Sequence, residues 1–122
     1  MSRIQSRENA FKLIYSKLYV EDAHLQDSSI EEIDDFCVSI VGAFTNNMEE
    51  IKSRASSNLK GTTIDRIYKI DLALIYLAIA EMFYVENSEY KVVINEVVEL
   101  AKKYSTEKSP KFINGFLAGL VK

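Results

Sequence analysis

Basic side chains gather in two short segments of a chain that is acidic as a whole. The formal net charge of the 122 residues is −3. Residues 1–18 and residues 102–111 nevertheless each contain four lysines or arginines and a single glutamate, so each segment is +3. Residues 19–36, which directly follow the first basic segment, hold seven acidic residues and no basic one. Such asymmetry is typical of a protein with an anionic partner.

The second basic segment is a candidate anion-binding site, although lysines near a helix end are usually only solvating. Ser109-Pro110 predicts a helix start, because serine caps helices and proline fits the first turn. The free backbone N–H groups and positive dipole end of such a helix form an anion site. An aromatic ring one turn into the helix could stack on an unpaired base, with burial in the core as its alternative. The candidate RNA contacts here are Lys102, Lys108, Lys111 and Phe112.

The first basic segment adds two arginines. Arg3 and Arg7 are four residues apart and share one helix face if the helix begins early enough. Arginine stacks on bases and makes bidentate contacts, which suits single-stranded RNA better than a lysine point charge does. We therefore predict that Arg3 and Arg7 contact RNA.

Catalysis and metal binding have little support in the sequence. The single histidine, His24, lies in the acidic stretch without a second histidine or a nearby cysteine, so metal-ligand spacing is absent. Cys37 falls on the apolar side of its predicted helix, where it is expected to be a small buried hydrophobe. Glu96 and Glu99 are expected to form a solvated, charge-paired helix face with the lysines that follow. We expect no enzymatic activity, no metal and no cofactor.

The compartment follows from cysteine use and hydropathy. One cysteine cannot form an internal disulfide, and the first twenty residues lack the apolar stretch of a signal peptide. The longest apolar run, residues 72–80, has nine residues, too few to span a membrane. We therefore expect a cytoplasmic protein.

Apolar periodicity predicts helices throughout. One proline and four glycines leave little turn chemistry for a sheet protein. Residues 1–122 are therefore expected to form one compact all-α domain, a helical bundle of six or seven helices. The first expected helix covers residues 4–20, and the longest one follows the capping-box pattern of residues 29–32 and extends to Ile51. A short helix is expected at 64–68 and a core helix at 72–83. Two more helices are expected, one before and one after the polar run 105–109.

Several single residues have expected structural roles. Thr63 and Asp71 are predicted helix caps. The spacing of Gly115 and Gly119 suggests small residues that let a neighbouring helix approach. Tyrosines on or near the core helix are expected to pack rather than to bind bases; these are Tyr68, Tyr76 and Tyr84.

Three blocks of the sequence resemble one known family. Its C-terminal signature is matched by Ile94-Asn95-Glu96, Glu99-Leu100-Ala101-Lys102, Lys111-Phe112, Asn114-Gly115 and Leu117. Its opening helix is matched by Arg7-Glu8-Asn9-Ala10 with Leu13-Ile14-Tyr15, and its central block by Ile64-Asp65-Arg66-Ile67, Ile70-Asp71 and Leu77-Ala78-Ile79-Ala80-Glu81-Met82. The chain in this way resembles the NusB family of bacterial transcription antitermination factors.

The resemblance implies an all-α NusB-like fold and a role as an RNA-binding adaptor. With the ribosomal protein NusE, such a protein binds the boxA element of nascent ribosomal RNA and helps assemble an antitermination complex on RNA polymerase. Arg7, Lys111 and Phe112 match the family's RNA-contact positions, and Asp71 matches an acidic position expected to face NusE. Lys108 replaces a frequent acidic residue and favours phosphate contact. Tyr76 stands where arginine is common, so no role of that arginine carries over.

A second interpretation stays open. Proteins that resemble this family are sometimes dimeric, so the chain could instead be a homodimeric helical interaction module whose RNA binding is masked or lost. The sequence does not choose between a monomer and a dimer.

Overall fold

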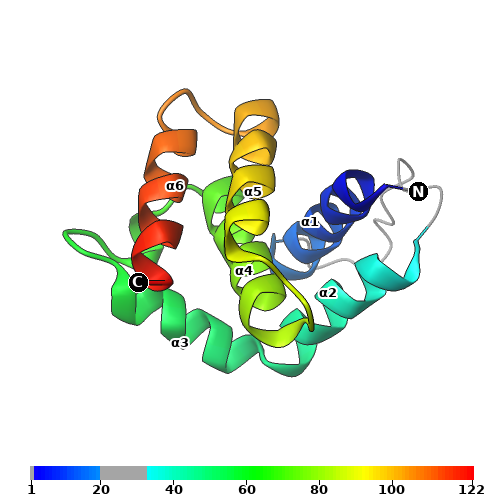
Figure 1. The fold of residues 1–122 in the computed structure, drawn as a ribbon. Coiled ribbons are helices and arrows are strands. Elements are labelled where there is room, and N and C mark those ends of the chain that lie inside the picture. The colour runs from blue at the N-terminus through cyan, green and yellow to red at the C-terminus, as the bar shows by residue number, and fades with distance from the viewer. Residues whose placement is uncertain (1, 20–32) are drawn as a thin grey trace.

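The computed structural model describes residues 2–19 and 33–122, and within these residues it contains helices and no strand (Figure 1). The prediction of an all-α fold with six or seven helices is confirmed. The elements are α1 (Arg3–Tyr19), α2 (Asp35–Asn46), α3 (Met48–Asn58), the short 3-10 helix η1 (Ile64–Arg66), α4 (Lys69–Tyr84), α5 (Tyr90–Tyr104) and α6 (Ser109–Leu120).

Helix α4 is the centre of the core, as its sequence predicts. Every residue from Asp71 to Met82 is buried, because α1, α2, α3, α5 and α6 all pack against this helix. Figure 1 shows α4 behind α5, with α1 and α2 on one side and α6 on the other. A helix with apolar residues all round is stable only when it is surrounded in this way.

Two of the side chains that the sequence predicts to pack lie fully in the core. Cys37 is fully buried, and burial together with the nearby charge of Asp34 raises the pKa of its thiol to about 11. Tyr76 is 2% exposed and stacks on Phe44 with ring centroids 5.8 Å apart. Both residues are confirmed as packing residues.

The predicted longest helix, from the capping box to Ile51, is wrong, because two helices, α2 and α3, meet at Asn47. The Asn47 side-chain amide donates to the carbonyl of Ala43 at 2.9 Å, so a local hydrogen bond competes with continuation of the helix. The longest described helix is α1, with 17 residues. The predicted capping box at residues 29–32 and His24 lie outside the described residues, and Asp34 caps α2 through the backbone N–H of Cys37 at 2.9 Å.

Two further cap predictions are wrong, and a third holds only in part. Helix α4 begins at Lys69 after Tyr68, so Asp71 lies inside its first turn and is not its cap. Lys108 precedes α6, which places Ser109 within the helix, although Pro110 does occupy the first turn as predicted. Thr63 does stand at the cap position of η1, but its side chain makes no capping hydrogen bond, and η1 ends at Arg66, short of the predicted helix end at Tyr68.

None of the described helices is both long enough and apolar enough to cross a membrane.

Candidate nucleic-acid interface

The α5–α6 joint, defined here as residues 102–112, is a tight turn closed by backbone hydrogen bonds. The N–H of Ser105 donates to the carbonyl of Ala101 at 2.9 Å and ends α5. The N–H of Ser109 donates to the carbonyl of Thr106 at 3.1 Å, and α6 begins there. The two helices therefore leave the joint side by side, as Figure 1 shows.

A buried polar cluster lies under the joint. The two carboxylate oxygens of Asp71 accept hydrogen bonds from the hydroxyls of Ser105 at 2.5 Å and Ser109 at 3.0 Å. Ser109 also accepts from the backbone N–H of Thr106 at 3.2 Å. Asp71 is 7% exposed and Ser109 is 1% exposed, so these groups depend on one another for hydrogen bonds. Asp71 therefore ties the first turn of α4 to the joint.

This position changes how the partner-docking prediction for Asp71 is understood. The carboxylate faces the joint from below and already has two hydroxyl donors, so it is not an open acidic group on the surface. No local sequence pattern indicates these contacts, because the partners lie 34 and 38 positions away along the chain. Docking through Asp71 stays a prediction, and any such effect would act through the joint.

Four lysines of the joint are exposed, and two of them have no ion-pair partner among the described residues. Lys108 and Lys111 are exposed, and within the described residues neither forms an ion pair. Lys102 is also exposed, but its Nζ lies 2.7 Å from a carboxylate oxygen of Glu99, the charge-paired helix face that the sequence predicts. Phe112 is half-buried beside Phe116, with ring centroids 6.3 Å apart. Two free cations and a partly accessible ring thus meet where α6 begins.

Arg7, the first-segment residue with the closest family match, is buried. It is 5% exposed and forms a bidentate ion pair with Glu81, in which Nε donates to Oε1 and the second guanidinium nitrogen to Oε2, both at 2.7 Å. Glu81 itself is 1% exposed. This geometry does not agree with the prediction that Arg7 touches RNA. Its guanidinium instead fixes α1 to α4.

Arg3 differs from Arg7 because it is exposed. Its guanidinium lies over the ring of Phe36, 4.4 Å from the ring centroid, and the Arg7 guanidinium lies 5.3 Å from the same centroid. Stacking on an aromatic ring orders an arginine without neutralising its charge. RNA contact by Arg3 therefore stays a prediction that the geometry allows.

Glu8 links the two basic segments. Its carboxylate accepts a hydrogen bond from Lys103 Nζ at 2.7 Å and another from the Tyr104 hydroxyl, so α1 lies against the end of α5. Burial acts to raise the pKa of Glu8, but these hydrogen bonds and the Lys103 charge outweigh it and lower that pKa. The same contact raises the pKa of Lys103. The two segments are brought together, but part of their charge is neutralised.

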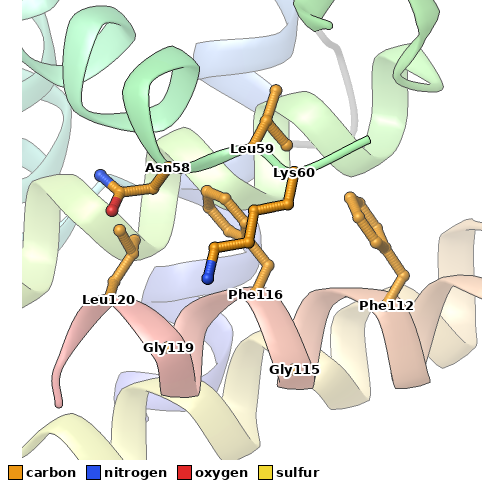
Figure 2. Close-up of a pocket in the computed structure, with 8 residues that line it drawn as sticks. All are labelled: Asn58, Leu59, Lys60, Phe112, Gly115, Phe116, Gly119 and Leu120. Atoms are coloured by element: carbon orange, nitrogen blue, oxygen red, sulfur yellow. The ribbon is translucent and has the colours of Figure 1, made fainter. Parts of the chain in front are cut away.

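A groove lies between Phe112 and the segment that follows α3. It has a volume of about 270 Å³ and separates α6 from residues 58–60, as Figure 2 shows. Gly115 and Gly119 lie along it, and a Cβ atom built on either glycine meets nothing within 4 Å. The prediction that these glycines admit a close neighbouring helix is wrong, because they leave this groove open.

Comparisons with known proteins agree with this architecture. The NusB family profile matches residues 4–122. The transcription antitermination protein NusB of Finegoldia magna is 40% identical over all of this chain and 95% of its own length, and that of Acetivibrio thermocellus is 39% identical over all of this chain and 90% of its own.

One solved structure is similar in sequence as well as in fold. A crystal structure of the antitermination factors NusB and NusE in complex with dsRNA contains a chain that is 27% identical, with a TM-score of 0.79. The alignment covers 98% of this chain and 97% of that one. With a family match over nearly the whole sequence and a shared fold, the chain belongs to the NusB family.

Proposed function

We propose that this protein is an RNA-binding transcription antitermination factor that acts in the cytoplasm and catalyses no reaction. Together with NusE it binds boxA-type RNA in nascent ribosomal transcripts and helps assemble an antitermination complex on RNA polymerase. The names of its relatives support this role, as does the similar chain that was crystallised with NusE and RNA.

The observation that carries the proposal is the exposed α5–α6 joint. Lys108 and Lys111 have no carboxylate partner among the described residues; Lys108 lines a pocket together with the half-buried ring of Phe112, and Lys111 directly precedes Phe112 in the chain. Lysines supply phosphate contacts through counterion release, and an aromatic ring can stack on an unpaired base. Lys102 adds charge at the start of the joint, and Arg3, which lies over Phe36, is a separate candidate contact on α1.

Buried polar residues hold this surface in place. Arg7 fixes α1 against α4 through Glu81, and Asp71 fixes the joint through Ser105 and Ser109. Both are positioning residues, which act on RNA through the geometry of the groups above them. A net-acidic protein gains usable affinity when a basic partner extends its RNA-binding face, which is the place of NusE in the proposal.

A titration of labelled single-stranded boxA-type RNA tests the function. We expect weak binding by the protein alone and tighter binding when NusE is added. The double variant Lys108→Gln/Lys111→Gln should weaken both, and the matched control Lys91→Gln, an exposed lysine at the far end of α5, should not. The proposal fails if NusE leaves the affinity unchanged and the double variant binds like the native protein. A stable dimer by light scattering that binds no RNA would support the homodimeric module instead.

A further inference from the structure

A second pocket opens on the η1 side of Phe112 and involves residues from outside both basic segments. It has a volume of about 270 Å³ and lies between η1 and the start of α6. Arg66 and Tyr68 line one side, and Lys108 and Phe112 line the other. Asp71 and Ser109, which are hydrogen-bonded to each other, form part of its lining as well.

Tyr68 is the unexpected member of this pocket. Its sequence position predicts packing, yet it is 52% exposed. It precedes α4 in an extended conformation, with φ −57° and ψ 136°, and so does not join the face of α4 that packs in the core. A tyrosine ring that is half in solvent and borders a pocket offers a surface on which a flat group can stack.

The charges of the pocket select an anion. Arg66 and Lys108 are both exposed and, within the described part of the chain, neither forms an ion pair. The one carboxylate in the lining, Asp71, is already hydrogen-bonded to two hydroxyls. The pocket therefore combines two free cations with two aromatic rings. A nucleotide carries the matching groups, a phosphate and a flat base.

We propose that this pocket holds one unpaired nucleotide of the bound RNA, with its base stacked on Tyr68 and its phosphate held by Arg66 and Lys108. The inference rests on the proposed function and deepens it, because η1 becomes a third RNA-contact segment. An unpaired nucleotide is required, because a base inside a duplex offers no free face to a side chain. An acidic peptide of a protein partner could use the cations but would not need an open tyrosine ring.

Two substitutions test the pocket directly. Tyr68→Ala should lower the affinity for single-stranded boxA-type RNA about 5- to 100-fold, the range that base–aromatic stacking gives. Arg66→Gln should flatten the dependence of log affinity on log salt by about 0.7, the loss of one single-strand phosphate contact. Both side chains are exposed, so urea denaturation should show an unchanged fold. Matched controls are Tyr90→Ala, 41% exposed at the far end of α5, and Lys52→Gln, exposed on α3.

An RNA carrying one abasic site, moved along the sequence, identifies the nucleotide. At one position the abasic site should weaken binding to the native protein but add nothing to the defect of Tyr68→Ala. If the two defects are additive at every position, the base does not stack on Tyr68 and the pocket assignment is overturned.

The remaining outcomes separate the pocket from the overall function. If Tyr68→Ala and Arg66→Gln bind RNA normally while Lys108→Gln/Lys111→Gln binds weakly, the pocket assignment fails and the proposed function stands. If the Tyr68 and Arg66 variants lose NusE binding in the absence of RNA but keep RNA binding, the pocket is a protein contact. If the native protein binds no RNA with or without NusE, both proposals fail.

Discussion

The two basic segments have the same formal charge but expose it differently. In α1, Arg7 forms a buried ion pair with Glu81, while Arg3 lies at the surface over Phe36. At the α5–α6 joint, Lys108 and Lys111 remain in solvent, and the buried carboxylate below them bonds to serine hydroxyls. Formal charge per segment therefore overstates the unpaired charge of both regions: the paired cation of α1 is buried, whereas the paired lysines of the joint, Lys102 and Lys103, stay exposed.

Helix α4 supplies the buried carboxylate in both regions. Glu81, near its C-terminal end, takes the guanidinium of Arg7, and Asp71, in its first turn, takes the hydroxyls of Ser105 and Ser109. One acid neutralises a cation and the other leaves the cations free. The partner of each carboxylate makes the difference. Glu81 pairs with a cation, which is then buried in the fold, whereas Asp71 accepts from hydroxyls and leaves the nearby lysines exposed.

The largest expected effect is the loss of the Arg7 guanidinium. Arg7→Met leaves Glu81 charged and buried without a partner, which should lower the free energy of unfolding by about 3–5 kcal/mol. Urea denaturation measures this change. RNA affinity of the remaining folded protein should change far less than stability, because Arg7 is 5% exposed and its guanidinium is paired with Glu81.

The double variant Arg7→Met/Glu81→Leu is the matched control. Replacing both members of a buried pair with apolar residues is often neutral or stabilising, so stability should return. If Arg7→Met is as stable as the native protein but has lost much of its RNA affinity, Arg7 contacts RNA directly and the two basic segments do not differ in this way.

Phe112 should give the largest effect at the joint. Because its ring is half-buried, Phe112→Ala should cost about 1–3 kcal/mol of RNA binding through lost stacking. The loss of stability should stay below the roughly 3–5 kcal/mol expected for a fully buried phenylalanine. RNA titration and urea denaturation on one preparation separate the two effects. A full core-sized loss of stability with normal RNA affinity in the folded fraction would contradict stacking.

Asp71→Asn should have an intermediate effect. The amide keeps one acceptor for the hydroxyls of Ser105 and Ser109 but loses the charge, at a cost of about 1–2 kcal/mol of stability. RNA and NusE affinities should fall together, because the joint is loosened as a unit. A fall in NusE affinity alone, with stability unchanged, would instead show direct docking by Asp71. Ser109→Ala serves as a second probe of the joint.

The sequence predicts the helices well because periodicity is a local property. The apolar run of residues 72–83 predicts a surrounded helix, and α4 is one. The break lies at Asn47, where the backbone leaves the helical region with φ −129° and ψ 25°, and apolar periodicity does not register such a change. The predicted caps Asp71 and Ser109 lie inside their helices instead. Their carboxylate and hydroxyl groups bond to each other across the fold, which a local sequence pattern does not reveal.

The candidate site could be predicted only in part. Lys108, Lys111 and Phe112 lie close in sequence, so one local motif brings them together. Arg7 and Glu81 lie 74 positions apart, and nothing in the charge of residues 1–18 shows that α4 carries the partner. Arg66 and Tyr68 reach the joint only through the packing of α4 and α6, so the pocket they form is a property of the tertiary fold.

Charge reversal at the joint tests whether Lys111 contacts a phosphate. Lys111→Glu should weaken RNA binding and reduce the slope of log affinity against log salt by about 0.7 for single-stranded RNA, since one phosphate contact is lost. Titrations at several salt concentrations measure the slope. Lys102→Glu should have a smaller effect, because Lys102 is already paired with Glu99. Equal slopes for the native protein and Lys111→Glu would remove Lys111 from the interface.

The smallest effect should come from Glu8, which joins the two regions. Its folded pKa is lowered, so the stability it contributes is present above the ordinary carboxyl value of 4.5 and is lost as the pH falls through the folded pKa. Glu8→Gln should therefore be less stable than the native protein near neutral pH, and the difference in urea denaturation should shrink below pH 4.5.

The same variant tests whether pairing limits the charge of the second region. Glu8→Gln removes the carboxylate that neutralises Lys103, an exposed lysine of the joint. If Lys103 then reaches a phosphate, RNA affinity should rise slightly and its salt dependence should steepen, the reverse of the Lys111→Glu result. A variant that loses stability and binds RNA with an unchanged salt slope would show that Lys103 lies off the RNA path, and that only the α6 side of the joint carries the interface.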